Sequence, residues 1–243
     1  MSRRLLIGTG YHGASNVCGM PAEDFAEIWH RNTLNATMME QDCRYLCVGD
    51  SGNYPGWVSG HIEEQLVHIT GDLGHIRDKA DGKKNHALTG WAAGMLTAAM
   101  VAYTDERDFI YKEQDCLAWG NWIDRLYADL DGGIAAFGRG LRPPHQKLLS
   151  TQSLFIVKHE AIWRFVCHYL ELGEDVNSNS ARHGCFGECK FWRMHQRFPN
   201  AYHIQSADWN IDRDRPIPYE QRPLAAQQFT EQEMAELKQK GMI

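Results

Sequence analysis

Short apolar runs alternate with helix-like segments along the first half of the chain, and this alternation constrains the fold more than any other feature. Apolar runs at residues 5–7, 45–48, 65–70 and 109–111 each lead into a Gly- or Asp-rich loop or a polar turn. Helix-like segments follow the first, third and fourth runs. One begins near Pro21, the clearest covers residues 85–103, where apolar side chains recur at helical spacing, and the last carries Trp122, Ile123, Leu126 and Leu130. Strands that alternate with helices predict an α/β fold with a mainly parallel sheet flanked by helices.

The second half of the chain is less regular. It contains a glycine-rich stretch at 132–140, a strand at 153–157, a helix at 159–172, a polar loop at 173–187 and a short helix at 188–198. The sequence from Thr230 to Glu233 forms a capping box for a terminal helix. We therefore predict a single domain, in which residues 1–130 form an α/β half and residues 131–243 a smaller region that completes it.

Composition narrows the class of protein. The chain has 243 residues, a net charge of −6 and no basic stripe, so nucleic-acid binding is disfavoured as its main role. No apolar run reaches the length of a transmembrane segment, and the run at 5–7 is too short for the core of a signal peptide. The seven cysteines have irregular spacing, which favours free thiols in a reducing compartment. We expect a cytoplasmic protein without a transmembrane segment.

Four loops are predicted to converge at one edge of the sheet. In parallel sheets of this kind, ligands bind beyond the carboxyl ends of the strands. The loops at residues 8–13, 49–53, 71–84 and 113–116 all follow predicted strands and fall at that edge. Their convergence predicts a nucleotide-type site.

The sharpest motif is Glu113-Gln114-Asp115, directly after the strand at 109–111. Two carboxylates separated by one residue point to the same side of an extended backbone. Like charges this close are costly unless a cation compensates them. Mn²⁺ or Mg²⁺ takes such oxygen ligands together with substrate phosphates, so we predict that Asp115 and Glu113 bind one of these ions. The alternative is a solvated acidic loop.

The order of these motifs resembles that of GT-A glycosyltransferases over residues 5–130. Residues 105–126 resemble the helix, strand and DxD segment of that superfamily, with Glu113 where Asp is usual, and residues 82–87 resemble the entry to the preceding helix. Residues 45–52 resemble the second strand and its acidic loop, and Thr9-Gly10-Tyr11 resembles the Thr-x-Tyr after the first strand. The resemblance implies a GT-A-like, Rossmann-like fold and a nucleotide-sugar site formed by Thr9, Gly10, Tyr11, Asp50, Ser51, Glu113 and Gln114.

Further candidate residues come from the predicted ligand loops and from the same resemblance. Arg77 and Lys84 lie in the predicted ligand loops and are candidates for binding the diphosphate, although surface ion pairs are the commoner role of such residues. Glu188 resembles the acid at a helix start that acts as general base in inverting members, and Asp175 is a weaker candidate. His203 resembles, by position only, a late metal ligand.

The sequence thus predicts an enzyme that moves a sugar from a UDP- or GDP-type nucleotide sugar to a carbohydrate or other hydroxyl acceptor. Retention in place of inversion stays open, as do the donor sugar and the oligomeric state. A nucleotidyltransferase is one rival. An NAD(P)-binding oxidoreductase is another, because Gly8 to Gly13 matches G-x-G-x-x-G, although the first helix is expected only near Pro21. Zinc at His183, Cys185, Cys189 and His195 is disfavoured by their spacing.

Overall fold

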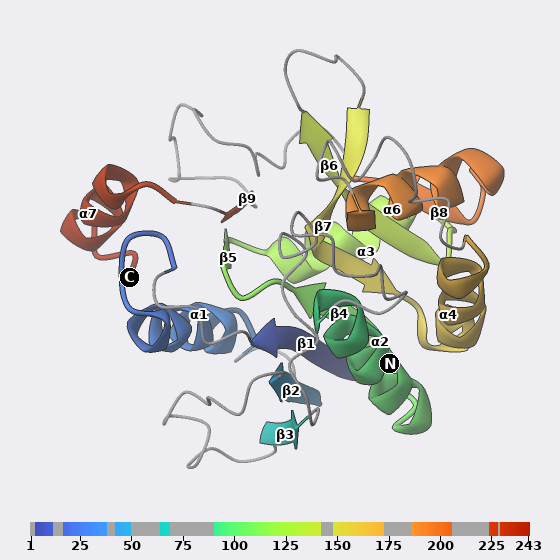
Figure 1. The fold of residues 1–243 in the computed structure, drawn as a ribbon, viewed down its shortest axis with the longest axis horizontal. Helices are drawn as coiled ribbons and strands as arrows, with labels where there is room; N and C mark the ends of the chain where they lie inside the picture. The colour runs from blue at the N-terminus through green and yellow to red at the C-terminus, as the bar shows by residue number, and fades with distance from the viewer. Residues whose placement is uncertain are drawn as a thin grey trace, which may run out of the picture.

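The computed structural model describes residues 3–11, 17–37, 42–49, 64–68, 90–141, 148–172, 186–205, 224–227 and 229–243. In this part of the chain, a seven-stranded sheet has the order β3-β2-β1-β4-β7-β6-β8 (Figure 1). The strands are β1 Leu5–Tyr11, β2 Cys43–Gly49, β3 Glu64–His68, β4 Asp108–Lys112, β6 Ala135–Leu141, β7 Leu148–Val157 and β8 Tyr202–Ile204. Strands from both predicted halves therefore share one sheet.

The sheet is mainly parallel. Strands β3, β2, β1 and β4 pair in parallel, and β6 and β8 pair in parallel with each other. Strand β7 lies between β4 and β6 and is antiparallel to both, so it alone runs opposite to the other six strands. The carboxyl ends of β1, β2 and β4 consequently meet at the same edge, as the sequence predicts.

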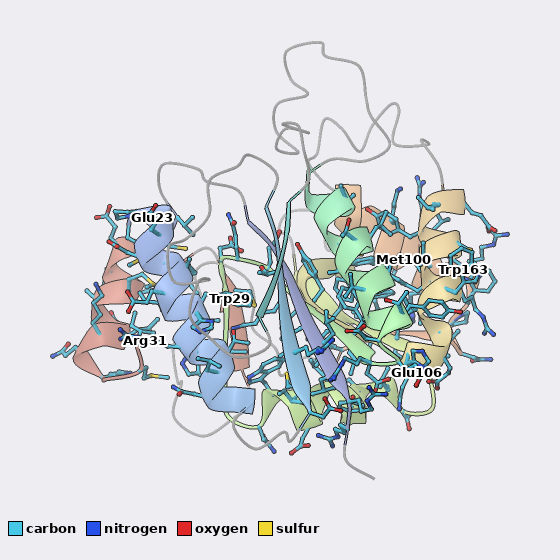
Figure 2. The ribbon with its side chains drawn as sticks, turned by 90° about the horizontal axis from the view of Figure 1, so that it is seen from below. Glu23, Trp29, Arg31, Met100, Glu106 and Trp163 are labelled. Atoms are coloured by element: carbon cyan, nitrogen blue, oxygen red, sulfur yellow. The ribbon has the colours of Figure 1, made fainter. Side chains whose placement is uncertain are left out.

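Helices cover both faces of the sheet. Helices α1 Ala22–Thr37, α3 Trp122–Leu130 and α7 Glu231–Gln239 contribute to one apolar cluster, and α2 Gly90–Thr104, α4 Ile162–Glu171 and α6 Phe186–Arg197 contribute to the other. Figure 2 shows β1 and β2 between α1 and α2. Successive residues of β1 alternate between the clusters, because Leu5 and Ile7 face one and Leu6 faces the other.

Helix α2 packs unusually close to β1. Its sequence contains no charged residue, and Ala98 is fully buried against the strand. A Cβ atom on Gly8 would lie 2.6 Å from Ala98 Cβ, so only glycine fits at this position of β1. The glycine of the predicted loop is thus needed for packing between helix and sheet.

Several predicted elements are confirmed with small changes in their bounds. Helix α3 carries the expected buried face, and Thr230 and Glu233 form the predicted capping box at the start of α7. The helix predicted at 159–172 begins with a 3₁₀ turn, His159–Ala161, before α4. Residues 85–89, predicted as the start of α2, lie outside the described residues.

A second sheet, which the sequence does not predict, lies beside the acidic triplet. Strand β5, Cys116–Trp119, pairs antiparallel with β9, Leu224–Gln227. Cys116 lies directly after Asp115, so the segment next to the triplet is held by residues from the far end of the sequence. In the described residues, no helix is long and apolar enough to span a membrane.

Candidate active site

Glu113, Gln114 and Asp115 form a turn between β4 and β5. Glu113 N donates a hydrogen bond to Ser153 O of β7 at 2.8 Å, and Cys116 N donates to Glu113 O at 2.9 Å. The three side chains are half-buried, and Asp115 Oδ1 is shielded from solvent. The triplet follows β4, as the sequence predicts. Its two carboxylates are not placed on one side by the alternation of side chains along a strand, because the backbone turns here instead of continuing the strand.

The end of β1 lies beside this turn. The parallel register between β1 and β4 ends with Gly8 paired to Tyr111, and Glu113 follows Tyr111 by two residues. Gly10 N donates a hydrogen bond to Tyr111 Oη at 3.2 Å, and the side chain of Thr9 is buried. Thr9 and Gly10 therefore lie at the end of β1, beside the strand that leads into the triplet.

Two other strands approach the same edge. Tyr11 pairs with Gly49, so β1 and β2 end at the same level. Asp50 and Ser51 follow Gly49 in the sequence, but they lie outside the described residues, as do Arg77, Lys84 and the side chain of Tyr11. Their predicted contacts with the nucleotide stay predictions.

A buried lysine lies directly before the triplet. Lys112 is fully buried, and its Nζ donates to Asn32 Oδ1 and Thr33 Oγ1 of α1, each at 2.8 Å. Burial lowers the pKa of Lys112 from 10.5 to about 7, and the negative charge of a Cys116 thiolate opposes that change. Its Nζ also lies 4.7 Å from the ring centre of Trp29.

This polar group beneath the turn was missed in the sequence. The signal that could reveal it is a lysine directly after an apolar run and directly before two carboxylates. A charged side chain at such a position is rarely buried without partners. The partners, Asn32 and Thr33, are not recognisable from the sequence, because they belong to a helix that precedes β4 by many residues.

Helix α6 places the backbone of Glu188 toward the carboxyl edge. Phe191 stacks on Phe137 with ring centres 4.3 Å apart, and His195 Nδ1 lies 2.6 Å from Tyr202 O. Tyr202 pairs with Ala135, at the amino end of β6, so α6 runs opposite to this strand. Glu188 is in the first turn of α6, on the side of the triplet, and its side chain lies outside the described residues.

His203 does not join the triplet. His203 lies on β8, where it pairs with Ala136 of β6. Strands β6 and β7 separate β8 from β4. Three strand spacings amount to roughly 14 Å. Its Nδ1 lies 3.3 Å from Asp129 O of α3. The prediction of His203 as a metal ligand does not fit this placement, since a position late in the sequence does not fix which strand of the sheet carries the residue.

Metal binding by the triplet alone would need further ligands. Within the described ranges, no group of three or more His, Cys, Asp or Glu side chains is arranged to hold a metal ion. Glu113 and Asp115 are a pair of carboxylates, which is what a phosphate-bound divalent ion takes from a protein.

Comparison with known proteins supports the fold. No protein-family model and no curated protein matches the chain. Similar solved structures include a glycosyltransferase involved in glycosylation of the major capsid of PBCV-1, with a TM-score of 0.54 and 9% identity over 99% of this chain and 100% of that chain. An active-site mutant of LgtC gives a TM-score of 0.52 and 9% identity over 92% of this chain and 86% of that chain.

A third similar structure belongs to another class of enzyme. The 4-diphosphocytidyl-2C-methyl-D-erythritol synthase from Anaerococcus prevotii gives a TM-score of 0.50 and 8% identity over 84% of this chain and 86% of that chain. Identities this low establish a shared fold and nothing finer. The chain therefore has a GT-A-like α/β fold, with a mostly parallel sheet flanked by helices.

Proposed function

We propose that the chain is a glycosyltransferase that moves a sugar from a nucleoside-diphosphate sugar, of UDP or GDP type, to a hydroxyl acceptor. The observation that carries this proposal is that Thr9 and Gly10 end β1 and Glu113–Asp115 follow β4 at the same carboxyl edge, where the two strands are parallel neighbours. Ligands of open α/β sheets bind at this edge. The GT-A-like fold favours a sugar nucleotide as the ligand.

The acidic pair suits Mn²⁺ or Mg²⁺. Both residues offer carboxylate oxygens, they are half-buried, and Asp115 Oδ1 is shielded from water. Such ions combine one or two protein carboxylates with substrate phosphates, so the pair suffices without His203. When bound, the ion would offset the negative charge that develops on the departing nucleoside diphosphate.

The remaining roles belong to residues of the chain itself. The segment from Thr9 to Tyr11, together with Asp50 and Ser51, would hold the nucleoside. Arg77 and Lys84 would bind phosphate oxygens. Glu188 would accept the proton of the acceptor hydroxyl while that oxygen bonds to the anomeric carbon and the bond to the diphosphate breaks. This single displacement inverts the anomeric centre.

Thermal stability with a panel of nucleotides tests the proposal. Ligands that bind only the folded state raise the melting temperature. We expect UDP, GDP or their sugars to raise it in the presence of Mn²⁺, and the rise to vanish in Asp115→Asn. The matched control is Asp131→Asn at the exposed end of α3, which should respond like the wild type. A Mn²⁺-independent rise with NAD(H) alone would instead favour a dinucleotide site at Gly8 to Gly13.

Nucleotide transfer to a sugar phosphate is the second candidate, and the similarity to the cytidylyl-transferring synthase favours it. The same carboxylate pair and the same edge of the sheet would serve both reactions. The released product distinguishes them, because nucleotidyl transfer releases pyrophosphate and glycosyl transfer releases a nucleoside diphosphate.

A further inference from the structure

Helix α1 holds the backbone on both sides of the acidic triplet. Trp29 Nε1 donates to Glu113 O at 2.9 Å. Asn32 Nδ2 donates to Ala118 O at 2.8 Å, and Asn32 Oδ1 accepts from Ala118 N at 2.9 Å. The same Oδ1 accepts from Lys112 Nζ. Contacts from one face of α1 thus reach the residue before the triplet, the triplet itself and the strand after it.

The bond from Trp29 fixes the orientation of one peptide group. Glu113 O accepts two hydrogen bonds, one from Cys116 N within the turn and one from Trp29 Nε1 outside it. A carbonyl oxygen has two lone pairs, so both are used. Glu113 N is held as well, by Ser153 O. The backbone that carries the two carboxylates therefore has little freedom to rotate.

Packing alone does not account for this arrangement. Trp29 is 3% exposed and faces the sheet, whereas Arg31 lies on the outer side of α1 (Figure 2). The buried indole N–H of Trp29 has a backbone acceptor, whereas a leucine or phenylalanine at the same position would fill the space without making that bond. Asn32 likewise pairs both of its polar groups with the backbone of β5.

We propose that Trp29 is a positioning residue, which fixes the Glu113 carbonyl and thereby holds Glu113 and Asp115 ready to bind a divalent cation. The proposal rests on the proposed function, in which these carboxylates bind Mn²⁺ or Mg²⁺. Its consequence is that loss of the indole N–H weakens cation binding even when the ring and the fold are kept. The indole acts only through the backbone of Glu113.

A matched control variant is available in α3. Trp122 is fully buried like Trp29, and its ring also faces Lys112 Nζ, at 5.9 Å. Trp122 Nε1 makes no hydrogen bond to any described residue. Trp122→Phe therefore removes a buried indole N–H without removing a hydrogen bond, whereas Trp29→Phe removes the bond to Glu113 O.

The experiment measures the Mn²⁺ concentration that gives half of the maximal rise in melting temperature, at a fixed saturating concentration of UDP and GDP. A neutral hydrogen bond contributes modestly, so we expect Trp29→Phe to need about three- to tenfold more Mn²⁺ than the wild type. Trp122→Phe should stay within about twofold of the wild type. If Trp29→Phe does not fold, benzothienylalanine at position 29 keeps the shape of indole and removes only the N–H.

Two results would overturn the proposal, and they are distinguishable. Equal Mn²⁺ requirements for Trp29→Phe and Trp122→Phe, with binding still lost in Asp115→Asn, would refute the positioning role and leave the metal site intact. A wild type without any Mn²⁺-dependent rise, and indistinguishable from Asp115→Asn, would refute the metal site and with it the role of Trp29.

Discussion

Replacing Lys112 by Met should change how the folding stability depends on pH. The Lys112 ammonium is buried among neutral acceptors, and burial lowers its pKa from 10.5 to about 7. Between these two values the unfolded chain binds a proton that the folded protein releases. The free energy of unfolding therefore rises with pH across this window, and the contribution is complete once the pH passes the unfolded value. Below pH 7 the folded state carries the full penalty of the buried charge.

The magnitude follows from the size of the shift. One pKa unit corresponds to 1.36 kcal/mol, so the stability should rise by at most about 3 kcal/mol between pH 7 and pH 9.5. The two hydrogen bonds and the nearby indole ring favour the ammonium and reduce this gain. The range stops short of pH 10, because burial raises the pKa of Tyr202 and its ionisation in the unfolded chain would then lower the stability.

Urea unfolding in metal-free buffer measures the effect. The free energy of unfolding of the wild type should rise from pH 7 to pH 9.5. The rise due to Lys112, at most about 3 kcal/mol, should be missing in Lys112→Met. Methionine leaves no acceptor stranded, because Asn32 Oδ1 still accepts from Ala118 N and Thr33 Oγ1 still donates to Trp29 O. We therefore expect the variant to be at least as stable as the wild type at pH 7. Parallel curves for the two proteins would refute the reasoning.

Three other substitutions have defined outcomes. Gly8→Ala should lower the free energy of unfolding by about 1–3 kcal/mol in urea titrations, because its Cβ would clash with Ala98, and an unchanged midpoint would contradict this close packing. Thr230→Ala removes the capping box of α7 and should cost about 1 kcal/mol, seen as a lower melting temperature. Asp115→Asn should abolish Mn²⁺-dependent nucleotide binding while the metal-free melting temperature stays near that of the wild type; retained binding would exclude Asp115 as a ligand.

The elements that sequence predicts correctly are those whose signal is local. Strand β4 contains the apolar run 109–111, and α3 repeats its buried residues at helical spacing. The capping box of α7 involves only Thr230 and Glu233, which are three residues apart. The sequence does not predict strands β5, β8 and β9. Each has only three or four residues and is stabilised by pairing with a strand that is distant in the sequence.

The candidate site divides in the same way. Glu113 and Asp115 are recognisable as candidates because two carboxylates after an apolar strand are visible in the sequence. Trp29, Asn32 and Lys112 are not recognisable in the same way. They act through hydrogen bonds between α1 and residues 112–113, which lie far along the chain. The predicted ligand His203 was misplaced for a related reason, since its strand joins the sheet beside β6 and far from β4.

The pairing of β5 with β9 bears on how the protein is made. Synthesis on the ribosome proceeds from the amino end, so residues 116–119 emerge long before residues 224–227, their partners in the second sheet. Contacts between segments so far apart in sequence form late, because closing a long loop costs entropy before the pairing repays it. The segment that follows Asp115 therefore stays without its β partner until residues 224–227 have been synthesised. A nascent chain halted before residue 224 would carry the acidic triplet without the strand that secures its neighbour.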